Sequence, residues 1–227
     1  MNLQGLQKLT LLDFPGKVAC TVFTYGCNFL CPFCHNSRLV TRAQNEGLTE
    51  AEFFSYLEKR RGILDGVCVS GGEPLMHNAE DFIKKIKSMG FAVKLDTNGS
   101  FPEKLRHLTE NSLVDYVAMD IKNSPHFYAE TCGKEINIDA IYESIDILLR
   151  GKTDYEFRTT VVREFHNEQR LIEAAGMIKG AKQYFLQGFI DSGELIGQDL
   201  HGFTGEEMEQ LKKAVCTVIP NTQLRGI

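Results

Sequence analysis

Three cysteines within eight residues are the most chemically specific feature of this sequence. Cys27, Cys31 and Cys34 are spaced as C-x₃-C-x₂-C. Offsets of four and seven residues would place three buried thiols on one face of a helix, but Pro32 disfavours a helix interior at this point. Clustered loop cysteines at such a spacing are typical of metal ligands. The sequence therefore predicts a metal centre held by these three side chains.

Two kinds of metal centre fit this spacing. A structural zinc ion takes four ligands, commonly as two C-x₂-C pairs, and His35 is the available fourth ligand beside the three thiolates. The sequence has no second C-x₂-C pair, because Cys20, Cys68, Cys132 and Cys216 stand apart from one another. A [4Fe–4S] cluster is normally held by four cysteines, so a cluster with three would keep one iron open to a small molecule.

The aromatic residue between the second and third cysteines makes the motif recognisable. C-x₃-C-x-aromatic-C, with Phe33 as the aromatic residue and His35 following the last cysteine, resembles the cluster motif of the radical S-adenosylmethionine (SAM) enzymes. The resemblance implies that the open iron binds the amino and carboxylate groups of SAM. It also implies one-electron cleavage of SAM to methionine and a 5′-deoxyadenosyl radical, which abstracts hydrogen from C–H bonds. The cofactor performs this chemistry, and the protein orients it.

The next predicted strand ends in the segment Gly71-Gly72-Glu73-Pro74. Paired glycines allow a backbone to approach a ligand closely, and the proline prevents the strand from continuing. Taken alone, the segment is equally typical of an ordinary turn. The resemblance implies that Gly71, Gly72 and Glu73 contact the methionine amino group of SAM.

Two further strands end in polar residues. Asp96-Thr97-Asn98 closes one of them, and Asp120 and Lys122 close the next. Alone they are typical of capped turns and solvated strand ends. SAM binding calls for a partner for its amino group, a cation for its carboxylate and an acceptor for its ribose hydroxyls, which Asp96, Lys122 and Asp120 can supply in turn. The resemblance extends to activases that hold a monovalent cation at these positions, although this sequence does not by itself predict that cation.

The last two predicted strands carry one candidate each. Arg158 lies in the middle of its strand, and it is a candidate for SAM or substrate binding or, alternatively, a structural arginine in a salt bridge. Related activases have a ribose-contacting histidine near the end of the last strand. This sequence has no histidine there, and Gln187 is the candidate replacement.

Short β-branched apolar runs alternate with amphipathic segments along the chain. The predicted strands are Lys17–Thr24, Gly66–Ser70, Phe91–Asp96, Asp115–Asp120, Tyr155–Val162 and Lys182–Gln187. Such an alternation predicts an α/β fold with a parallel sheet, and the chain has room for about six of the eight units of a closed barrel. We therefore expect a partial, open (β/α)₆ barrel of the radical SAM type, with a doubly wound sheet as the alternative. Either fold gathers ligands at the carboxyl ends of its strands.

Composition and length limit the possible domain organisation and the possible binding partners. The chain has 227 residues, 43% of them hydrophobic and 24% charged, and a net charge of −5. No stretch is rich enough in Pro, Gly or Ser to mark a linker between domains, so we expect a single domain over residues 1–227, with a core of about 17–190 and a C-terminal helix and tail at 204–227. The acidic balance disfavours nucleic-acid binding. No apolar run reaches the ~20 residues that span a bilayer, and no secretory signal is seen, so we expect a cytoplasmic protein with reduced thiols.

A segment before the first predicted parallel strand indicates the substrate. Asp13-Phe14-Pro15-Gly16 resembles the Asp-x-Pro-Gly segment by which glycyl-radical-enzyme activases contact their protein substrate, so Asp13, Pro15 and Gly16 are candidate substrate contacts. A plain turn is the alternative. From about Leu11 to Val162 the chain resembles the activating proteins of anaerobic ribonucleoside-triphosphate reductase.

That resemblance implies hydrogen abstraction from a glycine Cα of a partner glycyl radical enzyme, with flavodoxin or ferredoxin as the electron donor. Two alternatives remain open. One is a radical SAM enzyme that acts on a small molecule, such as a 7-deazaguanine-type synthase. The other is a non-catalytic metal-binding interaction module.

Overall fold

The computed structural model describes residues 1–41 and 47–227, and within them a single eight-stranded sheet organises the fold. The strands lie side by side in chain order, and only β1 (Leu3–Thr10) runs antiparallel to its neighbour. The parallel strands are β2 (Ala19–Thr24), β3 (Gly66–Gly71), β4 (Ala92–Thr97), β5 (Tyr116–Asp120), β6 (Asp154–Val161), β7 (Tyr184–Gly188) and β8 (Thr222–Arg225). Because all seven run in one direction, their carboxyl ends meet at one edge of the sheet.

The α/β fold class and the partial, open barrel are confirmed, but the sheet has two more strands than predicted. The six predicted strands correspond to β2 through β7, and β1 and β8 are edge strands that the sequence analysis missed. Gln7, Lys8 and Leu9 of β1 are exposed, and β8 has only four residues. An edge strand pairs on one side only and buries few side chains, so its apolar pattern is weak.

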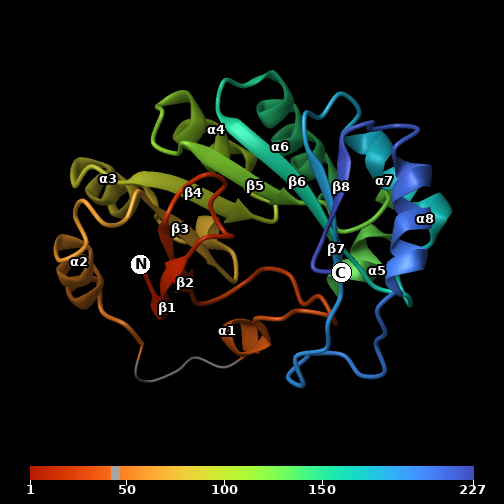
Figure 1. Ribbon diagram of the computed structural model, residues 1–227, viewed down its shortest axis with the longest axis horizontal. Helices are drawn as coiled ribbons and strands as arrows, with labels where there is room; N and C mark the ends of the chain where they lie inside the picture. The colour runs from red at the N-terminus through yellow and green to blue at the C-terminus, as the bar shows by residue number, and fades with distance from the viewer. Residues whose placement is uncertain (42–46) are drawn as a thin grey trace.

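Helices cover the convex face of the sheet (Figure 1). They are α2 (Glu50–Glu58), α3 (Glu80–Ser88), α4 (Pro102–Glu110), α5 (Tyr128–Cys132), α6 (Ile138–Arg150), α7 (Glu168–Met177) and α8 (Gly205–Val215), with 3₁₀ turns η1 (Pro74–Met76) and η2 (Pro125–Phe127). The short helix α1 (Ser37–Thr41) lies apart from them, after the cysteine loop (Figure 1). Their starts are fixed locally: Thr49 begins α2 and Thr204 begins α8, each with a reciprocal side-chain cap from a glutamate three residues on.

The two faces of the sheet differ in polarity. Val93 and Leu95 of β4 are fully buried in the apolar core against the helices. Lys94 and Asp96, which alternate with them, pair with each other on the opposite face. Since successive side chains of a strand point to opposite faces, the polar face is the concave interior of the barrel. A parallel sheet with both faces covered is usually apolar throughout, so this polarity marks the concave face as the place for a ligand.

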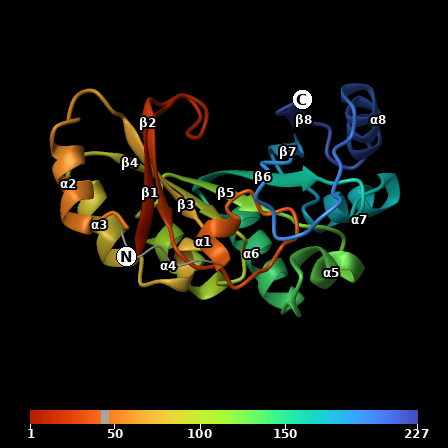
Figure 2. The ribbon, with the colours of Figure 1, turned by 90° about the horizontal axis from the view of Figure 1, so that it is seen from below.

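The barrel is open along one side. Figure 2 shows the sheet curved like a trough, with the β1–β2 hairpin rising on one side and β7 and β8 on the other. β1 and β8 are the two ends of the strand order and do not pair with each other. The middle of the concave face is nevertheless covered by side chains, since Cys68, Lys94 and Glu156 are at most 1% exposed. No helix in the described part of the chain is both long enough and apolar enough to cross a bilayer.

Candidate active site

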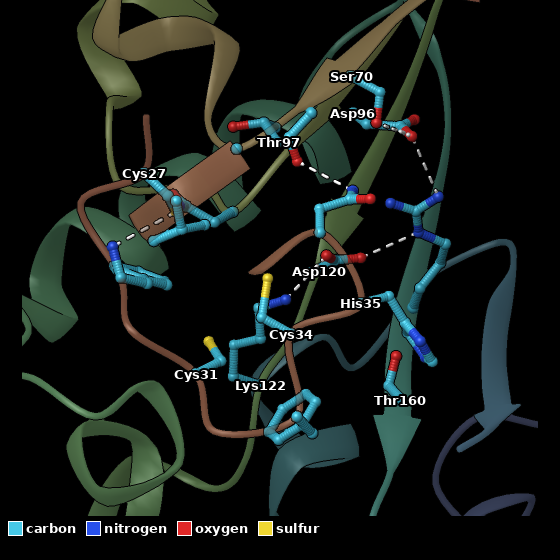
Figure 3. A pocket seen from close by; sticks show the side chains of 18 of the residues that line it. Cys27, Cys31, Cys34, His35, Ser70, Asp96, Thr97, Asp120, Lys122 and Thr160 are labelled. Carbon is cyan, nitrogen blue, oxygen red and sulfur yellow. Dashed lines mark hydrogen bonds and ion pairs between the residues drawn. The ribbon is translucent and has the colours of Figure 1, made fainter. Parts of the chain in front are cut away.

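A cavity of about 260 Å³ opens at the carboxyl ends of the strands, and most of the predicted site residues line it (Figure 3). The predicted residues in its lining are Cys27, Cys31, Phe33, Cys34, His35, Gly71, Gly72, Asp96, Thr97, Asn98, Asp120, Lys122, Arg158 and Gln187. They come from the loop after β2 and from the ends of β3 through β7. The barrel geometry thus brings together residues that lie up to 160 positions apart in the sequence.

The paired glycines at the end of β3 allow the cysteine loop to pack closely against this strand. A Cβ atom on Gly72 would lie 1.9 Å from the carbonyl oxygen of Gly26, and Gly71 has a φ of +124°. The backbone N–H of Glu73 donates to that Gly26 oxygen at 2.8 Å. A side chain at position 72 would push the loop away from the strand, so glycine is required here for close backbone packing.

The three thiols of the loop differ in their surroundings. Burial raises the pKa of Cys27 to about 12 and also raises the pKa of Cys34. A hydrogen bond from the fully buried Cys132 lowers the pKa of Cys31 to about 7. Cys132 lies behind Cys31 and is not in the cavity lining. At neutral pH Cys27 and Cys34 are therefore protonated without metal, and a metal must displace their protons to bind.

The donor set fits an iron–sulfur cluster better than a single zinc ion. Among residues 1–41 and 47–227, no three His, Cys, Asp or Glu side chains converge closely enough to hold one metal ion. A zinc site needs four ligands around one ion, whereas each cysteine of a [4Fe–4S] cluster binds a different iron. The exposed His35 ring packs against Phe189, with centroids 5.8 Å apart, and points away from the sulfur atoms (Figure 3).

A chain of alternating charges forms the opposite wall of the cavity. The Lys94 ammonium contacts Asp96 Oδ1, and Arg158 Nη1 lies 3.5 Å from Asp96 Oδ2. Arg158 Nε donates to Asp120 Oδ1 at 2.9 Å, and Lys122 Nζ donates to Asp120 Oδ2, also at 2.9 Å. The salt-bridge alternative for Arg158 is thus present, and its guanidinium also lines the cavity.

The charged groups of this wall keep their charges despite burial. Burial by itself would raise the pKa of Asp96 and Asp120, but the positive charges, Arg158 first, outweigh it and hold both pKa values below their usual range. Burial would likewise lower the pKa of Lys122 and Arg158, but the Asp120 carboxylate raises both. The wall is a preformed ionic network that presents Lys122 and Arg158 to the cavity.

Glu73, unlike Gly71 and Gly72 of the same motif, does not line the cavity. Its side chain is fully buried and outside the cavity lining. Its carboxylate accepts hydrogen bonds from Asn98 N at 2.6 Å, Thr97 Oγ1 at 2.9 Å and Leu75 N at 3.0 Å. Burial raises the pKa of Glu73 to about 7. The glutamate therefore positions the turn after β4 from behind, and it faces away from the cavity.

The predicted substrate-contact segment lies at the other end of the barrel. Asp13, Pro15 and Gly16 are in the hairpin between β1 and β2 and do not line the cavity. Thr21 Oγ1 donates to Asp13 Oδ2 at 2.5 Å, and the buried Phe14 ring packs on Tyr116 with centroids 6.1 Å apart. The six residues of β2 separate this segment from the cysteine loop by about 20 Å.

Sequence reasoning missed a buried histidine that supports both walls. His166 is 3% exposed, and its Nδ1 accepts from Val162 N at 3.0 Å while its Nε2 donates to Lys122 O at 2.8 Å. Its ring lies 6.5 Å from the Phe33 ring. A lone histidine after a strand carries no recognisable signal, so only the fold shows this role. Ser70 and Thr160 also line the cavity without having been predicted.

Comparison with known proteins assigns the chain to a family. Residues 21–178 match the model of the Radical SAM superfamily. The chain belongs to this superfamily. It is therefore a radical SAM enzyme, and its cofactors are a [4Fe–4S] cluster and SAM, as the resemblance implied. This assignment excludes the alternative that the cysteine motif belongs to a non-catalytic metal-binding module.

Named relatives of this radical SAM enzyme fall into two groups. A protein of Methanocaldococcus jannaschii named as a glycyl-radical enzyme activating enzyme is 34% identical over 192 residues, which are 82% of this chain and 78% of the relative. The pyruvate formate-lyase-activating enzyme of Clostridium pasteurianum is 30% identical over 132 residues, 54% of this chain and 52% of the relative. A 7-carboxy-7-deazaguanine synthase of Hyperthermus butylicus is 30% identical over 95 residues, 41% of this chain and 40% of the relative.

Solved structures agree on the fold. The Streptococcus suis protein SuiB, in its structure bound to S-adenosylmethionine, superposes with a TM-score of 0.71 at 12% identity. The superposition covers 88% of this chain and 48% of SuiB, so the chain spans about half the length of SuiB. At this identity the likeness shows the fold alone.

Proposed function

We propose that this protein is a glycyl-radical enzyme activating enzyme whose partner is an anaerobic ribonucleoside-triphosphate reductase. The observation that carries the proposal is the 34% identity, over most of both chains, to a protein named as such an activating enzyme. The reductase as the partner is supported by the sequence resemblance from Leu11 to Val162. Flavodoxin or ferredoxin is the proposed source of the electron.

In this proposal one wall of the cavity would bind the cluster and the other would bind SAM. Cys27, Cys31 and Cys34 would hold three irons of the cluster, and Lys122 and Arg158 would face the carboxylate of SAM. When bound, the cluster and SAM supply the one-electron cleavage that lets the 5′ carbon take one hydrogen atom from the partner's glycine Cα. The protein's part is to orient SAM and to keep water and other hydrogen donors away from that carbon.

The open side of the barrel suits a protein substrate. Because β1 and β8 do not pair, the barrel is not closed between them (Figure 2), and a loop of the partner would reach the cavity at the carboxyl ends of the strands. Leu11 and Leu12 at the tip of this hairpin are 68% and 86% exposed. Exposed apolar side chains next to Asp13 and Pro15 support a contact of this hairpin with the partner surface.

The test combines the anoxic, cluster-reconstituted protein with SAM, a reductant and the candidate reductase. A glycyl radical signal in electron paramagnetic resonance is the expected result. Replacing both hairpin leucines, Leu11→Ser with Leu12→Ser, is expected to reduce radical formation while SAM cleavage without the partner stays unchanged. SAM cleavage that never yields a glycyl radical in the reductase would overturn the choice of partner.

A second candidate is a 7-carboxy-7-deazaguanine synthase, which the identity to the Hyperthermus butylicus relative favours over part of the chain. The two candidates differ in the size of their substrate. A synthase consumes a small molecule and needs no protein partner, so turnover of that small molecule in the absence of the reductase would favour it.

A further inference from the structure

A lysine is buried in the middle of β4, where the sequence analysis assigned it no role. Lys94 is 1% exposed, and its side chain lies on the concave face of the sheet. Taking an ammonium group out of water is unfavourable unless a counter-charge receives it. Here Asp96 Oδ1 receives it, and Asp96 lines the cavity proposed for SAM.

Asp96 and Asp120 are the two carboxylates of the charged wall, and each of their four oxygens has a partner within the chain. Asp96 Oδ1 pairs with Lys94, and Asp96 Oδ2 accepts from Ser70 Oγ at 3.0 Å and faces Arg158 at 3.5 Å. Asp120 Oδ1 pairs with Arg158 and Asp120 Oδ2 with Lys122. A free cation that approached Asp96 Oδ1 would lie next to the Lys94 ammonium, whose positive charge repels it.

The wall also carries an excess of positive charge. Lys94, Arg158 and Lys122 are three cations against the two carboxylates Asp96 and Asp120, so the network has a net charge of +1. The neighbouring Glu156 is not counted, because Arg225 pairs with both of its oxygens, at 2.9 and 3.1 Å. Asp13 is not counted either, because it bonds to Thr21 and lies outside the cavity lining. An anionic group of a ligand would neutralise the excess.

Lys94 determines how this charge is distributed. Without its ammonium, Asp96 would compete with Asp120 for Arg158, and the two carboxylates would share two cations with no excess. Asp96 Oδ1 would then be free to bind a cation from solution. The Lys94 ammonium thus leaves Arg158 free to pair with Asp120, and Arg158 and Lys122 are the cations that line the cavity.

We propose that Lys94 is a positioning residue that serves as a built-in cation: it occupies the site on Asp96 that a bound monovalent metal ion would fill, so this protein binds SAM without one. The inference rests on the proposal that the cavity holds SAM, and it concerns what this chain supplies from its own sequence. It predicts that SAM affinity does not respond to potassium or sodium as such, but only to ionic strength.

The experiment measures the dissociation constant of SAM by titration calorimetry on the anoxic, cluster-loaded protein. The titration is run in potassium chloride and in tetramethylammonium chloride at equal ionic strength, because tetramethylammonium is too large to replace a coordinated metal ion. For the unsubstituted protein we expect the two dissociation constants to agree within about twofold. A clear requirement for potassium would overturn the inference and leave the activating function intact.

Two substitutions at Lys94 sharpen the test. Lys94→Met keeps the length of the side chain without its charge, and it is expected to weaken SAM binding by about tenfold in either salt. Lys94→Ala leaves space beside Asp96, so it is expected to bind SAM weakly in tetramethylammonium and to recover in potassium. The matched control is Lys84→Met on α3, an exposed lysine paired with Glu80, which is expected to leave the dissociation constant unchanged.

The possible outcomes distinguish a failure of the Lys94 inference from a failure of the proposed SAM site. If both Lys94 variants bind SAM as tightly as the unsubstituted protein, Lys94 does not act on the cavity and the inference is wrong. If the variants do not fold, the comparison of the two salts on the unsubstituted protein still decides. If the unsubstituted, cluster-loaded protein binds SAM in neither salt, the assignment of the cavity fails first, and with it the proposed roles of the charged wall.

Discussion

The two walls of the cavity differ in how complete they are before any cofactor binds. The charged wall, formed by the ends of β4, β5 and β6, is a finished network in which each carboxylate oxygen has a partner. The cysteine wall is a loop whose Cys27 and Cys34 thiols are held protonated by burial. The fold therefore fixes the charged side chains in position before SAM binds, whereas the cysteine thiols lose their protons only when metal binds.

The largest expected effect is on the cysteine wall. Cys27→Ala, Cys31→Ala or Cys34→Ala each removes one of three thiolates, and a cluster held by two is not expected to persist. We expect loss of the iron and sulfide that the reconstituted protein carries, and loss of SAM cleavage. Iron and sulfide analysis with visible absorption measures the result.

The matched control for the cysteine variants is Cys216→Ala. Cys216 caps α8 and lies outside the cavity lining, so its loss is expected to leave the iron content unchanged. Full iron content and SAM cleavage in any of the three cysteine variants would contradict the account of this wall.

The second effect is on the charged wall, where a single substitution should break the network. Asp120→Asn leaves Arg158 and Lys122 without the carboxylate they share, and their side chains are only 14% and 16% exposed. Leaving buried charges unpaired costs about 3 kcal/mol. We expect a lower urea midpoint for the cluster-loaded protein, together with weaker SAM binding.

Asp146→Asn is the control for this substitution, because Asp146 pairs with Arg150 on the exposed side of α6. Exposed pairs of this kind contribute at most about 1 kcal/mol. Equal urea midpoints for the Asp120 and Asp146 variants would show that the charged wall is not a network on which the fold depends.

The smallest effect concerns Glu73, which joins the walls by its backbone bond to Gly26 and its side-chain bonds to Thr97 and Asn98. Its folded pKa of about 7 lies above the ordinary value of 4.5, so the folded state keeps the proton longer than the unfolded chain. The contribution of Glu73 to stability is therefore full below about pH 4.5 and falls as the pH rises to about 7. The slope is at most about 1.4 kcal/mol per pH unit.

Glu73→Gln carries no titrating proton, so it is expected to lose less stability than the unsubstituted protein between pH 5 and pH 7. Urea unfolding at pH 5, 6, 7 and 8 measures the two profiles. Parallel profiles across this range would show that Glu73 does not titrate in the window that its burial indicates.

The cavity could be predicted largely because its chemistry is local in the sequence. Cysteine spacing and polar residues at strand ends are short-range signals, and a parallel α/β fold brings every strand end to the same edge. Cys27, Asp96, Asp120 and Lys122 could therefore be named as candidates without coordinates. Periodicity predicted the six inner strands for the same reason.

The residue roles that the sequence did not predict depend on contacts between distant segments of the chain. Lys94 is indistinguishable in sequence from an ordinary strand lysine, because its role depends on pairing that only the folded network shows. Cys132 and His166 act from behind the lining, on Cys31 and on the Lys122 backbone. Glu73 belongs to a predicted motif, yet the sequence did not show whether its side chain points into the cavity. Neighbouring side chains at the end of a strand can point to opposite faces of the sheet.

Binding of SAM to the open iron can be measured by electron–nuclear double resonance on the reduced, cluster-loaded protein mixed with SAM labelled with ¹⁵N in its amino group. If Cys27, Cys31 and Cys34 hold a cluster with one open iron, the ¹⁵N nucleus is expected to couple to the cluster spin. A cluster spectrum that is identical with and without SAM, and that shows no ¹⁵N coupling, would contradict the account.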